Sequence, residues 1–513
     1  MAILSPYWGL DGIILFVSFW ILAYLYMTRK FKYWQKRGIM EATPSPFIGN
    51  FWDCFLLKKS PADFVKDLYV QSKGLPYMGF YVFDKPFILI REPELVKHVL
   101  AKDFNYFSDR YASPDVHDRL GYANLFMMKN PGWKVLRSKL TPIFTSGKLK
   151  KMFELMAEIG LELDKHLSSL QLQGKGKNMD VKDVCAKFTT DMIATTAFGI
   201  RADALNNPNA DFRKYGKKVF EYNISRGFEF LTIFFIPGMV RSTGAKFFGK
   251  EVSQFFRSVF WQVINERVDS GTKRNDLIDL LIELKKTYGD QDLGGFKFND
   301  DDLVAQASVF FTGGFETSST TMSFALYELA LQPDIQKKLR VEILEALEKN
   351  GGKVTYDMIN SLPYLDMVVS ETLRMYPPLG FLDRVAIQDY KVPDSDLVIE
   401  KGTPVVISMI GMHYDPQYYS NPEKFDPERF NDENKKNRPS YVYFPFGEGP
   451  HICIGLRLGL LQSKLGLMHL LKDYEYTPSE HTSIPLRIDP KGLTTTAVGG
   501  IQLNVRKFVS EAA

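Results

Sequence analysis

Cysteine is scarce in this chain of 513 residues, which has only Cys54, Cys185 and Cys453. An odd number of widely spaced thiols argues against a disulfide framework and fits a domain that folds in a reducing compartment, with one thiol free for chemistry. Positive and negative charges nearly balance, with a formal net charge of only +4. A balance this slight gives no reason to expect nucleic acid as a partner, and we expect none.

Charged residues are absent from residues 12–28, where Ile, Leu, Phe, Val, Trp and Tyr dominate. As a helix this stretch would span about 25 Å, enough for a thin bilayer such as that of the endoplasmic reticulum. The basic run from Arg29 to Arg37 contains no acid, so the positive-inside rule keeps it in the cytosol. A cleaved signal peptide is the alternative, but it would need a basic segment before the apolar run and a small-residue cleavage site after it. We therefore expect residues 1–28 to anchor the chain in the endoplasmic reticulum membrane, with the remainder on the cytosolic side.

Linkers, internal repeats and low-complexity tracts are absent beyond residue 50. Residues 29–50 are basic and include Pro44 and Pro46, which restrict the backbone and make a stiff linker. The simplest division is a membrane anchor at residues 1–28, this linker, and one globular domain at residues 51–513. The sequon at Asn223 would carry a glycan only in the lumen, so we interpret it as a chance match.

Helical periodicity dominates the middle of the chain, in residues 149–170, 247–269, 274–286, 301–332 and 333–349. Strand-like segments are fewer and shorter, at residues 81–90, 403–410 and 501–505. This mixture predicts a mainly α fold with a minor β part, and the lack of regular βαβ alternation argues against a doubly wound sheet. Gly313 and Gly314 fall inside a helical pattern, which predicts a distortion or the close approach of another group.

The strongest motif is Phe-Pro-Phe-Gly-Glu-Gly-Pro-His-Ile-Cys-Ile-Gly at residues 444–455, around Cys453. Gly447 and Gly449 permit a tight loop, and Gly455 would let a flat ligand approach the backbone. An apolar helix follows, whose free N–H groups would stabilise a thiolate, as an anionic sulfur ligand of haem iron requires. A lone cysteine is otherwise most often a small buried hydrophobe.

This loop resembles the haem-binding loop of cytochromes P-450, although the family usually has Arg where this chain has His451. Glu371 and Arg374 are three residues apart, on one helix face, and residues 425–430 look like the family's partner segment. The resemblance implies a cytochrome P-450 fold, with a buried network of Glu371, Arg374 and Arg429 behind the haem.

Haem b (iron protoporphyrin IX) is the cofactor that the resemblance implies, with Cys453 as its metal ligand. Trp133 and Arg137, four residues apart, and Arg384 match positions that bind a haem propionate. We expect His451 to keep a propionate contact, weaker than that of an arginine, unless it only fills space in the loop. The other expected haem contacts are Phe446, Gly447 and Gly314.

Residues 313–317, Gly-Gly-Phe-Glu-Thr, resemble the oxygen-activation motif of the family's long central helix. The resemblance implies that Thr317 and Glu316 are catalytic residues that supply protons during oxygen activation. The alternative is that Thr317 hydrogen bonds back to a carbonyl of its own helix.

The resemblance covers nearly the whole chain and implies a haem-thiolate monooxygenase that inserts one oxygen atom from O2 into a lipophilic small molecule. No dinucleotide-binding fingerprint occurs, so electrons would come from NADPH through a flavin reductase, with a small haem carrier of the cytochrome b type as a second donor. Residues 274–281 and the Cys453 loop look most like insect microsomal enzymes of xenobiotic or plant-toxin detoxification. A haem-thiolate isomerase or dehydratase, an endogenous hormone or lipid hydroxylase, and a haem carrier stay open as alternatives.

Three further expectations concern surfaces. The resemblance implies a mostly apolar substrate pocket lined by residues 104–126, 379–382 and 494–498 and by Phe310, Phe311 and Phe315. The reductase is expected on a basic face that contains Lys129, Lys134, Lys139 and Lys464. Residues 228–237 are too short for a second membrane span, so we expect them to dip into the membrane interface or to form a buried helix end.

Overall fold

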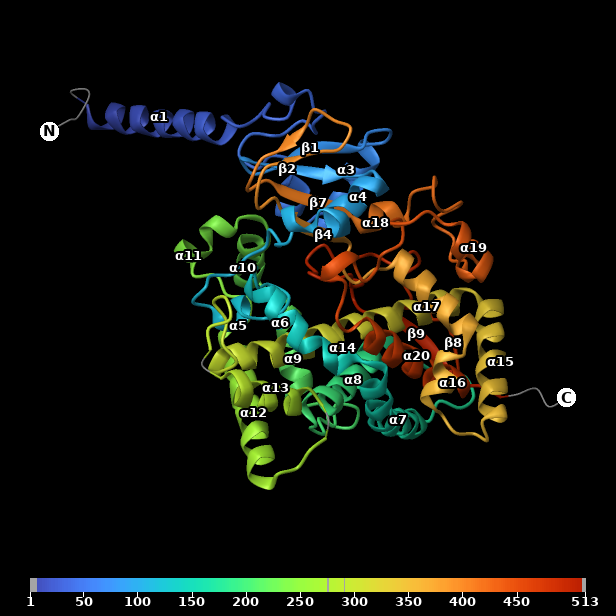
Figure 1. Ribbon diagram of the computed structural model, residues 1–513. Helices are drawn as coiled ribbons and strands as arrows, with labels where there is room; N and C mark the ends of the chain where they lie inside the picture. Colours follow the sequence, from blue (N-terminus) through green and yellow to red (C-terminus); the bar gives the residue numbers. More distant parts are fainter. Residues whose placement is uncertain (1–6, 275, 290, 510–513) are drawn as a thin grey trace.

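The computed structural model describes residues 7–274, 276–289 and 291–509, and within them the chain is mainly helical (Figure 1). The longer helices are α1 (Trp8–Thr28), α3 (Pro61–Gln71), α6 (Gly132–Leu140), α7 (Ser146–Ser169), α8 (Val181–Ile193), α9 (Asp211–Phe220), α10 (Ile224–Phe235), α12 (Lys250–Ser270), α13 (Leu277–Tyr288), α14 (Asp300–Leu331), α15 (Pro333–Lys349), α17 (Pro363–Met375) and α20 (Leu456–Lys472). The shorter ones are α2 (Trp52–Phe55), α4 (Pro93–Lys97), α5 (Arg119–Tyr122), α11 (Val240–Thr243), α16 (Tyr356–Asn360), α18 (Met409–His413) and α19 (Asp432–Asn437).

The strands form three small sheets. The largest has the order β1 (Tyr77–Val82), β2 (Lys85–Ile90), β7 (Pro404–Ser408) and β4 (Phe381–Val385), with only the β2–β7 pair parallel. The others pair β3 (Lys177–Asp180), β9 (Gln502–Lys507) and β8 (Tyr474–Pro478), and β5 (Tyr390–Lys391) with β6 (Val398–Ile399). In Figure 1 the largest sheet lies at the top, apart from the helices below.

Sequence periodicity predicted the long helices well. All five expected helices are present, as α7, α12, α13, α14 and α15, with ends that shift by three residues or fewer. The prediction of one strand at residues 81–90 was wrong, because this segment spans a hairpin. Phe83 has a φ of 54° in the turn between β1 and β2, and period-2 alternation alone gives no sign of such a turn.

Helix α14 runs through the centre of the helical part and is buried along most of its length. It contacts α8, α20 and α17, so side chains on its different faces reach different parts of the molecule. The predicted distortion at Gly313 and Gly314 is absent, since the helix continues through both. The predicted close approach is present at Gly314, where a Cβ atom would lie 2.6 Å from Ile193 Cδ1.

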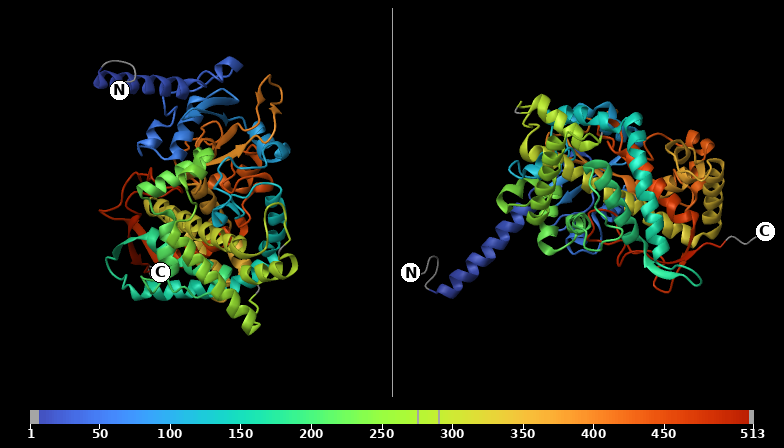
Figure 2. Two further views of the ribbon diagram at one scale, coloured as in Figure 1. Left: turned by 90° about the vertical axis from the view of Figure 1, so that its left-hand side faces the viewer. Right: turned by 90° about the horizontal axis from the view of Figure 1, so that it is seen from below.

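Helix α1 projects away from the rest of the molecule (Figures 1 and 2), and its apolar side chains are mostly exposed. Among the described residues it is the one helix that is long and apolar enough to cross a membrane. The linker after it packs on the largest sheet. Trp34 is fully buried against Gly79, Arg29 pairs with Asp84 at 3.0 Å, and Arg37 pairs with Glu400 at 2.5 Å. The linker is therefore fixed to the domain.

Candidate functional site

The Cys453 loop is a tight turn that leads into α20. Gly447 and Gly449 have φ values of 74° and 70°, and the Cys453 backbone N–H donates to the Phe446 carbonyl at 2.9 Å. Any side chain at residue 449 would clash with the Leu100 carbonyl, because a Cβ atom would lie 1.9 Å from its oxygen. The Cys453 side chain is exposed, whereas those of Cys54 and Cys185 are buried. The loop thus presents a single accessible thiol.

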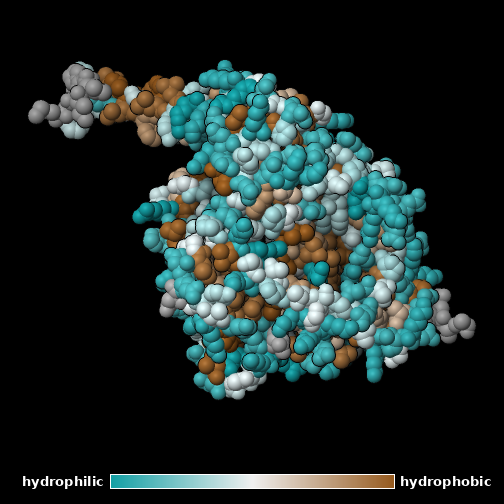
Figure 3. Space-filling model, in the orientation of Figure 1, coloured by the Kyte–Doolittle hydropathy of each residue, from teal (hydrophilic) through white to brown (hydrophobic). Residues whose placement is uncertain are grey.

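That thiol opens into a cavity of about 300 Å³ between α14, α20 and the Cys453 loop. Nine of the ten predicted site residues line this cavity: Trp133, Arg137, Gly314, Thr317, Arg384, Phe446, Gly447, His451 and Cys453. The tenth, Glu316, does not line it. On the face shown in Figure 3, apolar residues gather in a hollow between the β-rich part and the helices.

Arg384 is a buried cation at the edge of this cavity. Its Nη1 donates to the Asp383 carbonyl at 2.7 Å, but its Nε has no hydrogen-bond partner among the described residues. Burial lowers the pKa of Arg384 to about 9, because the guanidinium has lost water and has gained no ion pair within the described chain. An anion beside Arg384 could accept a hydrogen bond from its Nε and form an ion pair with the guanidinium.

The cavity therefore fits a haem. Leu382, Ile454 and Leu458 give the cavity apolar walls, and the Cys453 sulfur faces the space that a haem iron would occupy. The Arg384 Nε, unpartnered within the described part of the chain, could bind a carboxylate such as a haem propionate. Arg137 lines the same cavity and donates to the Ile452 carbonyl at 2.8 Å.

The Cys453 thiol is not acidic by itself. The exposed surface of Cys453 faces the internal cavity, so desolvation there raises the pKa of the thiol, and the Gly455 backbone N–H and the Arg137 charge offset only part of this effect. The Gly455 N–H at the start of α20 lowers the pKa of Cys453, as expected for a helix N-terminus, but desolvation raises that pKa by more. A metal cation bound to the sulfur would supply the remaining stabilisation of the thiolate, since coordination deprotonates a thiol.

His451 lies flat against Trp133, with ring centroids 3.8 Å apart and planes 30° apart. Its Nε2 is 2.7 Å from the Ser108 carbonyl, which can only accept, so Nε2 carries the proton. Burial lowers the pKa of His451 to about 2, so the ring is neutral and its Nδ1 can accept but not donate. This geometry favours a packing role for His451 over the expected propionate contact, because the only N–H of its neutral ring is already bonded to the Ser108 carbonyl.

Thr317 and Glu316 lie on different sides of α14. The Thr317 hydroxyl lines the cavity and donates to the Gly313 carbonyl at 2.7 Å, which is the back-bonded alternative. The Glu316 carboxylate is buried and pairs with Lys182 of α8 at 2.9 Å, outside the cavity lining. In this conformation only the hydroxyl of the expected pair faces the cofactor cavity.

Gln462 was missed from the sequence, whereas Arg110 lies within the expected lining range of residues 104–126 but was not singled out. Arg110 lines the cavity and pairs with Asp383 at 3.3 Å, and Gln462 of α20 donates to the Gly314 carbonyl at 2.6 Å. Arg110 lies in a segment without periodicity, and Gln462 resembles any polar residue of an amphipathic helix. Neither carried a signal that could have distinguished it.

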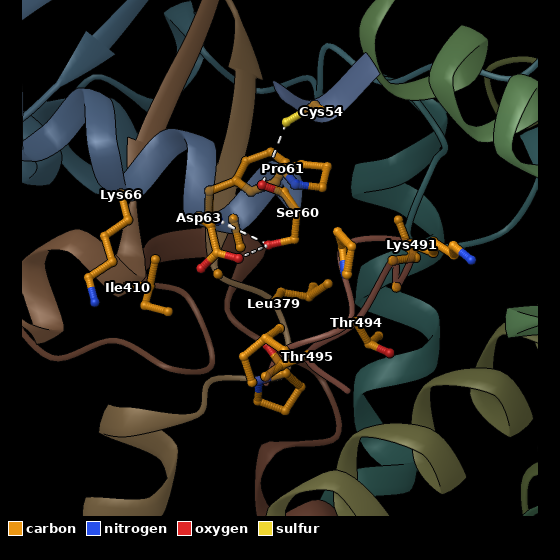
Figure 4. Close-up of a pocket in the computed structure, with 18 of the residues that line it drawn as sticks. Cys54, Ser60, Pro61, Asp63, Lys66, Leu379, Ile410, Lys491, Thr494 and Thr495 are labelled. Carbon is orange, nitrogen blue, oxygen red and sulfur yellow. Dashed lines mark hydrogen bonds between the residues drawn. The ribbon is translucent and has the colours of Figure 1, made fainter. Parts of the chain in front are cut away.

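A second cavity of about 780 Å³ adjoins the first, since Arg110, Phe126, Pro378 and Leu379 line both. Figure 4 shows Lys66 and Asp63 of α3 on one side of it and Lys491 and Thr494 on the other. Aromatic side chains form much of the remaining lining, and the phenylalanines among them are Phe51, Phe55, Phe126, Phe228, Phe230, Phe234, Phe235 and Phe381.

Much of the expected pocket lining is present in the two cavities, including residues 379–382 and Phe310. The prediction was wrong for Phe311 and Phe315. Both are fully buried in the core around α12, where Phe311 packs against Phe212 and Phe256. They face away from the cavity because α14 exposes only one side to it.

Comparison with known proteins agrees with this geometry. The sequence profile of the family described as Cytochrome P450 matches residues 41–504. The chain is 45% identical to "Cytochrome P450 6k1" of Blattella germanica over 98% of both proteins. It is 44% identical to "Probable cytochrome P450 6g2" of Drosophila melanogaster, and 40% identical to "Cytochrome P450 9e2" of Blattella germanica, in each case over 96% of this chain and 98% of the relative.

Proposed function

The chain belongs to the cytochrome P450 family and is a haem-containing monooxygenase, and on that premise we propose that it oxidises lipophilic xenobiotics such as plant toxins. The observation that supports this substrate class is the larger cavity, of about 780 Å³, whose aromatic wall adjoins the cofactor cavity. A wide space whose lining is mostly apolar, with charged side chains such as Asp63, Lys66 and Glu328 at separate points, accepts varied hydrophobic molecules better than it selects one hormone.

Reconstitution with an NADPH-dependent flavin reductase tests the proposal. Lipophilic plant compounds and insecticides are expected to give oxygenated products that require both NADPH and O2. Turnover without NADPH would indicate an isomerase or dehydratase instead. Product formation confined to endogenous hormones or lipids would refute the detoxification role while leaving the monooxygenase assignment intact.

Bound haem supplies the oxygen-activating chemistry, and the chain's residues hold and shield it. Cys453 would ligate the iron, with Arg384 and Arg137 at the edge of the cavity where a propionate would lie. The apolar walls exclude water from the reacting centre. Thr317 holds a hydroxyl proton at the cavity surface, and we propose that it relays protons to the reacting centre. Glu316, proposed as its catalytic partner, is ion-paired with Lys182 in this conformation and would have to leave that pair to take part.

Replacing Thr317 by Ala should uncouple the enzyme, so that NADPH consumption continues while peroxide rises and product falls about a hundredfold, at the low end for a proton-transfer group. The measurement is the ratio of product and peroxide to NADPH consumed. Thr321→Ala is the matched control, because Thr321 lines the same cavity one turn further and bonds back to the Thr317 carbonyl at 3.0 Å. Equal coupling in the parent and in Thr317→Ala would mean that Thr317 only back-bonds to its helix.

The reductase is proposed to dock beside α6, although two of the four expected lysines are unavailable. Lys129 is bound to the carbonyls of Arg110 and Ala112, and burial lowers its pKa to about 8. Lys464 is buried in an ion pair with Asp366 at 2.7 Å. Lys134 is exposed, and Lys139 is partly exposed.

Lys134→Glu should weaken apparent reductase affinity several-fold at low salt, and the loss should shrink as salt screens the charges. Reductase titrations at two ionic strengths measure this effect. Lys391→Glu, at an exposed position on β5, is the control. If both variants titrate like the parent, this face is not the docking site.

Location in the endoplasmic reticulum membrane, with the catalytic domain in the cytosol, is also proposed, and α1 with the basic residues after it supports this placement.

Helix α10 lies on the same side of the molecule as α1 (Figure 1) and exposes Ile224 and Phe228, which supports the proposal that it dips into the membrane interface. Asn223 of the sequon caps α10 by accepting from the Arg226 N–H at 3.0 Å. Flotation of a chain without residues 1–28 on vesicles tests the dip, and complete loss of binding at low salt would refute it.

A further inference from the structure

His413, at the end of α18, is fully buried and bonds to two distant segments. Its Nδ1 is 3.2 Å from the Arg374 carbonyl, and the Phe444 backbone N–H donates to its Nε2 at 3.3 Å. The Arg374 Nη1 in turn donates to the His413 carbonyl at 2.8 Å. His413 therefore bridges the C-terminal end of α17 and the start of the Cys453 loop.

The two partners define the protonation of the ring. A carbonyl can only accept and a backbone N–H can only donate, so Nδ1 carries the proton and Nε2 does not. Burial, followed by the Arg374 charge, lowers the pKa of His413 to about 3. Both hydrogen bonds consequently persist at neutral pH, and few side chains other than a neutral imidazole or a carboxamide could form them together.

The bridge continues toward the metal ligand through the loop itself. The Phe444 carbonyl accepts from the Gly447 N–H at 2.8 Å, and the Phe446 carbonyl accepts from the Cys453 N–H at 2.9 Å. At its other end the bridge begins at Arg374, which is held by two hydrogen bonds to Glu371, at 2.7 and 2.8 Å. An unbroken series of hydrogen bonds and short backbone links thus joins the buried ion pair to Cys453.

We propose that His413 is a positioning residue for the thiolate ligand, which transmits the rigidity of the Glu371–Arg374 pair to the Cys453 loop. The inference rests on the haem-thiolate assignment of Cys453. Groups that orient a metal ligand from behind it commonly alter metal affinity or activity by about 10–100-fold when they are removed. Without His413 the Phe444 N–H would be buried without an acceptor, and the loop could shift the sulfur away from the metal.

The test compares full-length holoproteins with His413→Leu, which removes both bonds, and His413→Gln, whose amide can donate and accept. Tyr443→Phe is the matched control, because it removes another bond between the loop and α17, from Tyr443 to the Ser370 carbonyl at 2.9 Å. The readout is the rate at which the carbon monoxide complex of the reduced protein loses its thiolate-ligated spectrum in mild denaturant, with the haem reduction potential and the unfolding midpoint measured in parallel.

We expect His413→Leu to lose the thiolate-ligated spectrum about tenfold faster than the parent and to shift the potential, with His413→Gln and Tyr443→Phe within about threefold of the parent. Parent-like rates in His413→Leu would overturn the proposal. So would a faster loss that matched a lower unfolding midpoint and appeared equally in Tyr443→Phe, since that pattern marks general destabilisation. If His413→Leu does not fold, His413→Asn replaces it, because its shorter amide cannot reach both partners.

Discussion

Replacing Cys453 by Ala is expected to abolish the thiolate-ligated carbon monoxide spectrum of the reduced enzyme and all NADPH-dependent turnover. Cys453 is the one cysteine whose side chain is exposed, and it opens into the cavity that fits a haem. No other Cys, His, Asp or Glu cluster among the described residues could hold a metal ion. Haem that still enters the cavity would lack its sulfur ligand.

The other two thiols are the controls for this prediction. Cys54 lines the larger cavity and Cys185 is fully buried beside α14. Cys54→Ala and Cys185→Ala should keep the spectrum, although the second removes core volume and should lower stability by about 1 kcal/mol, the usual size for a point substitution. An unchanged spectrum in Cys453→Ala would disprove the ligand assignment.

Replacing Arg374 by Leu is expected to yield little folded, haem-loaded protein. Arg374 is fully buried, and it donates to both oxygens of Glu371 and to the carbonyls of His413 and Pro422. Its loss leaves the Glu371 carboxylate buried with Arg429, at 3.3 Å, as its remaining ion-pair partner. Removal of one partner from a buried ion pair costs about 3–5 kcal/mol, which is a large share of a typical folding free energy.

Haem content of the purified protein and its denaturation midpoint measure this effect. The exposed pair of Lys338 and Glu428, at 2.7 Å, provides the contrast, and Lys338→Ala should change stability by less than about 1 kcal/mol. The double variant Glu371→Leu/Arg374→Leu should be less damaged than Arg374→Leu, because it removes the fully buried carboxylate and leaves only Arg429, whose side chain is 11% exposed, without its partner. Parent-like haem content in Arg374→Leu would show that the pair is dispensable.

The sequence predicted the local features of the site well. The Cys453 loop is specified by its own glycines and by the helix after it, so a contiguous motif contained most of its geometry. Side-chain direction was harder to predict. Thr317 and Glu316 are adjacent in the sequence, but successive helical residues point about 100° apart, so one faces the cavity and the other faces Lys182.

Long-range partners were the main omission. Lys129 and Lys464 looked like surface charges, but each has a specific acceptor more than ten residues away in the sequence. His413 contacts Arg374 and Phe444 across gaps of 39 and 31 residues. No periodicity or local motif encodes such pairs, because they arise only when separate elements pack together.

The burial of Trp34 against Gly79 has a consequence for how this enzyme meets other proteins. If α1 anchors the chain as proposed and the electron donor is held in the same bilayer, the two proteins would meet by lateral diffusion, and their redox centres would need similar heights above the lipid for electrons to pass. A flexible tether would let that height fluctuate. Here the segment after α1 is fixed to the largest sheet by Trp34 and by the Arg29–Asp84 and Arg37–Glu400 pairs, so on that placement the fold itself would set the height.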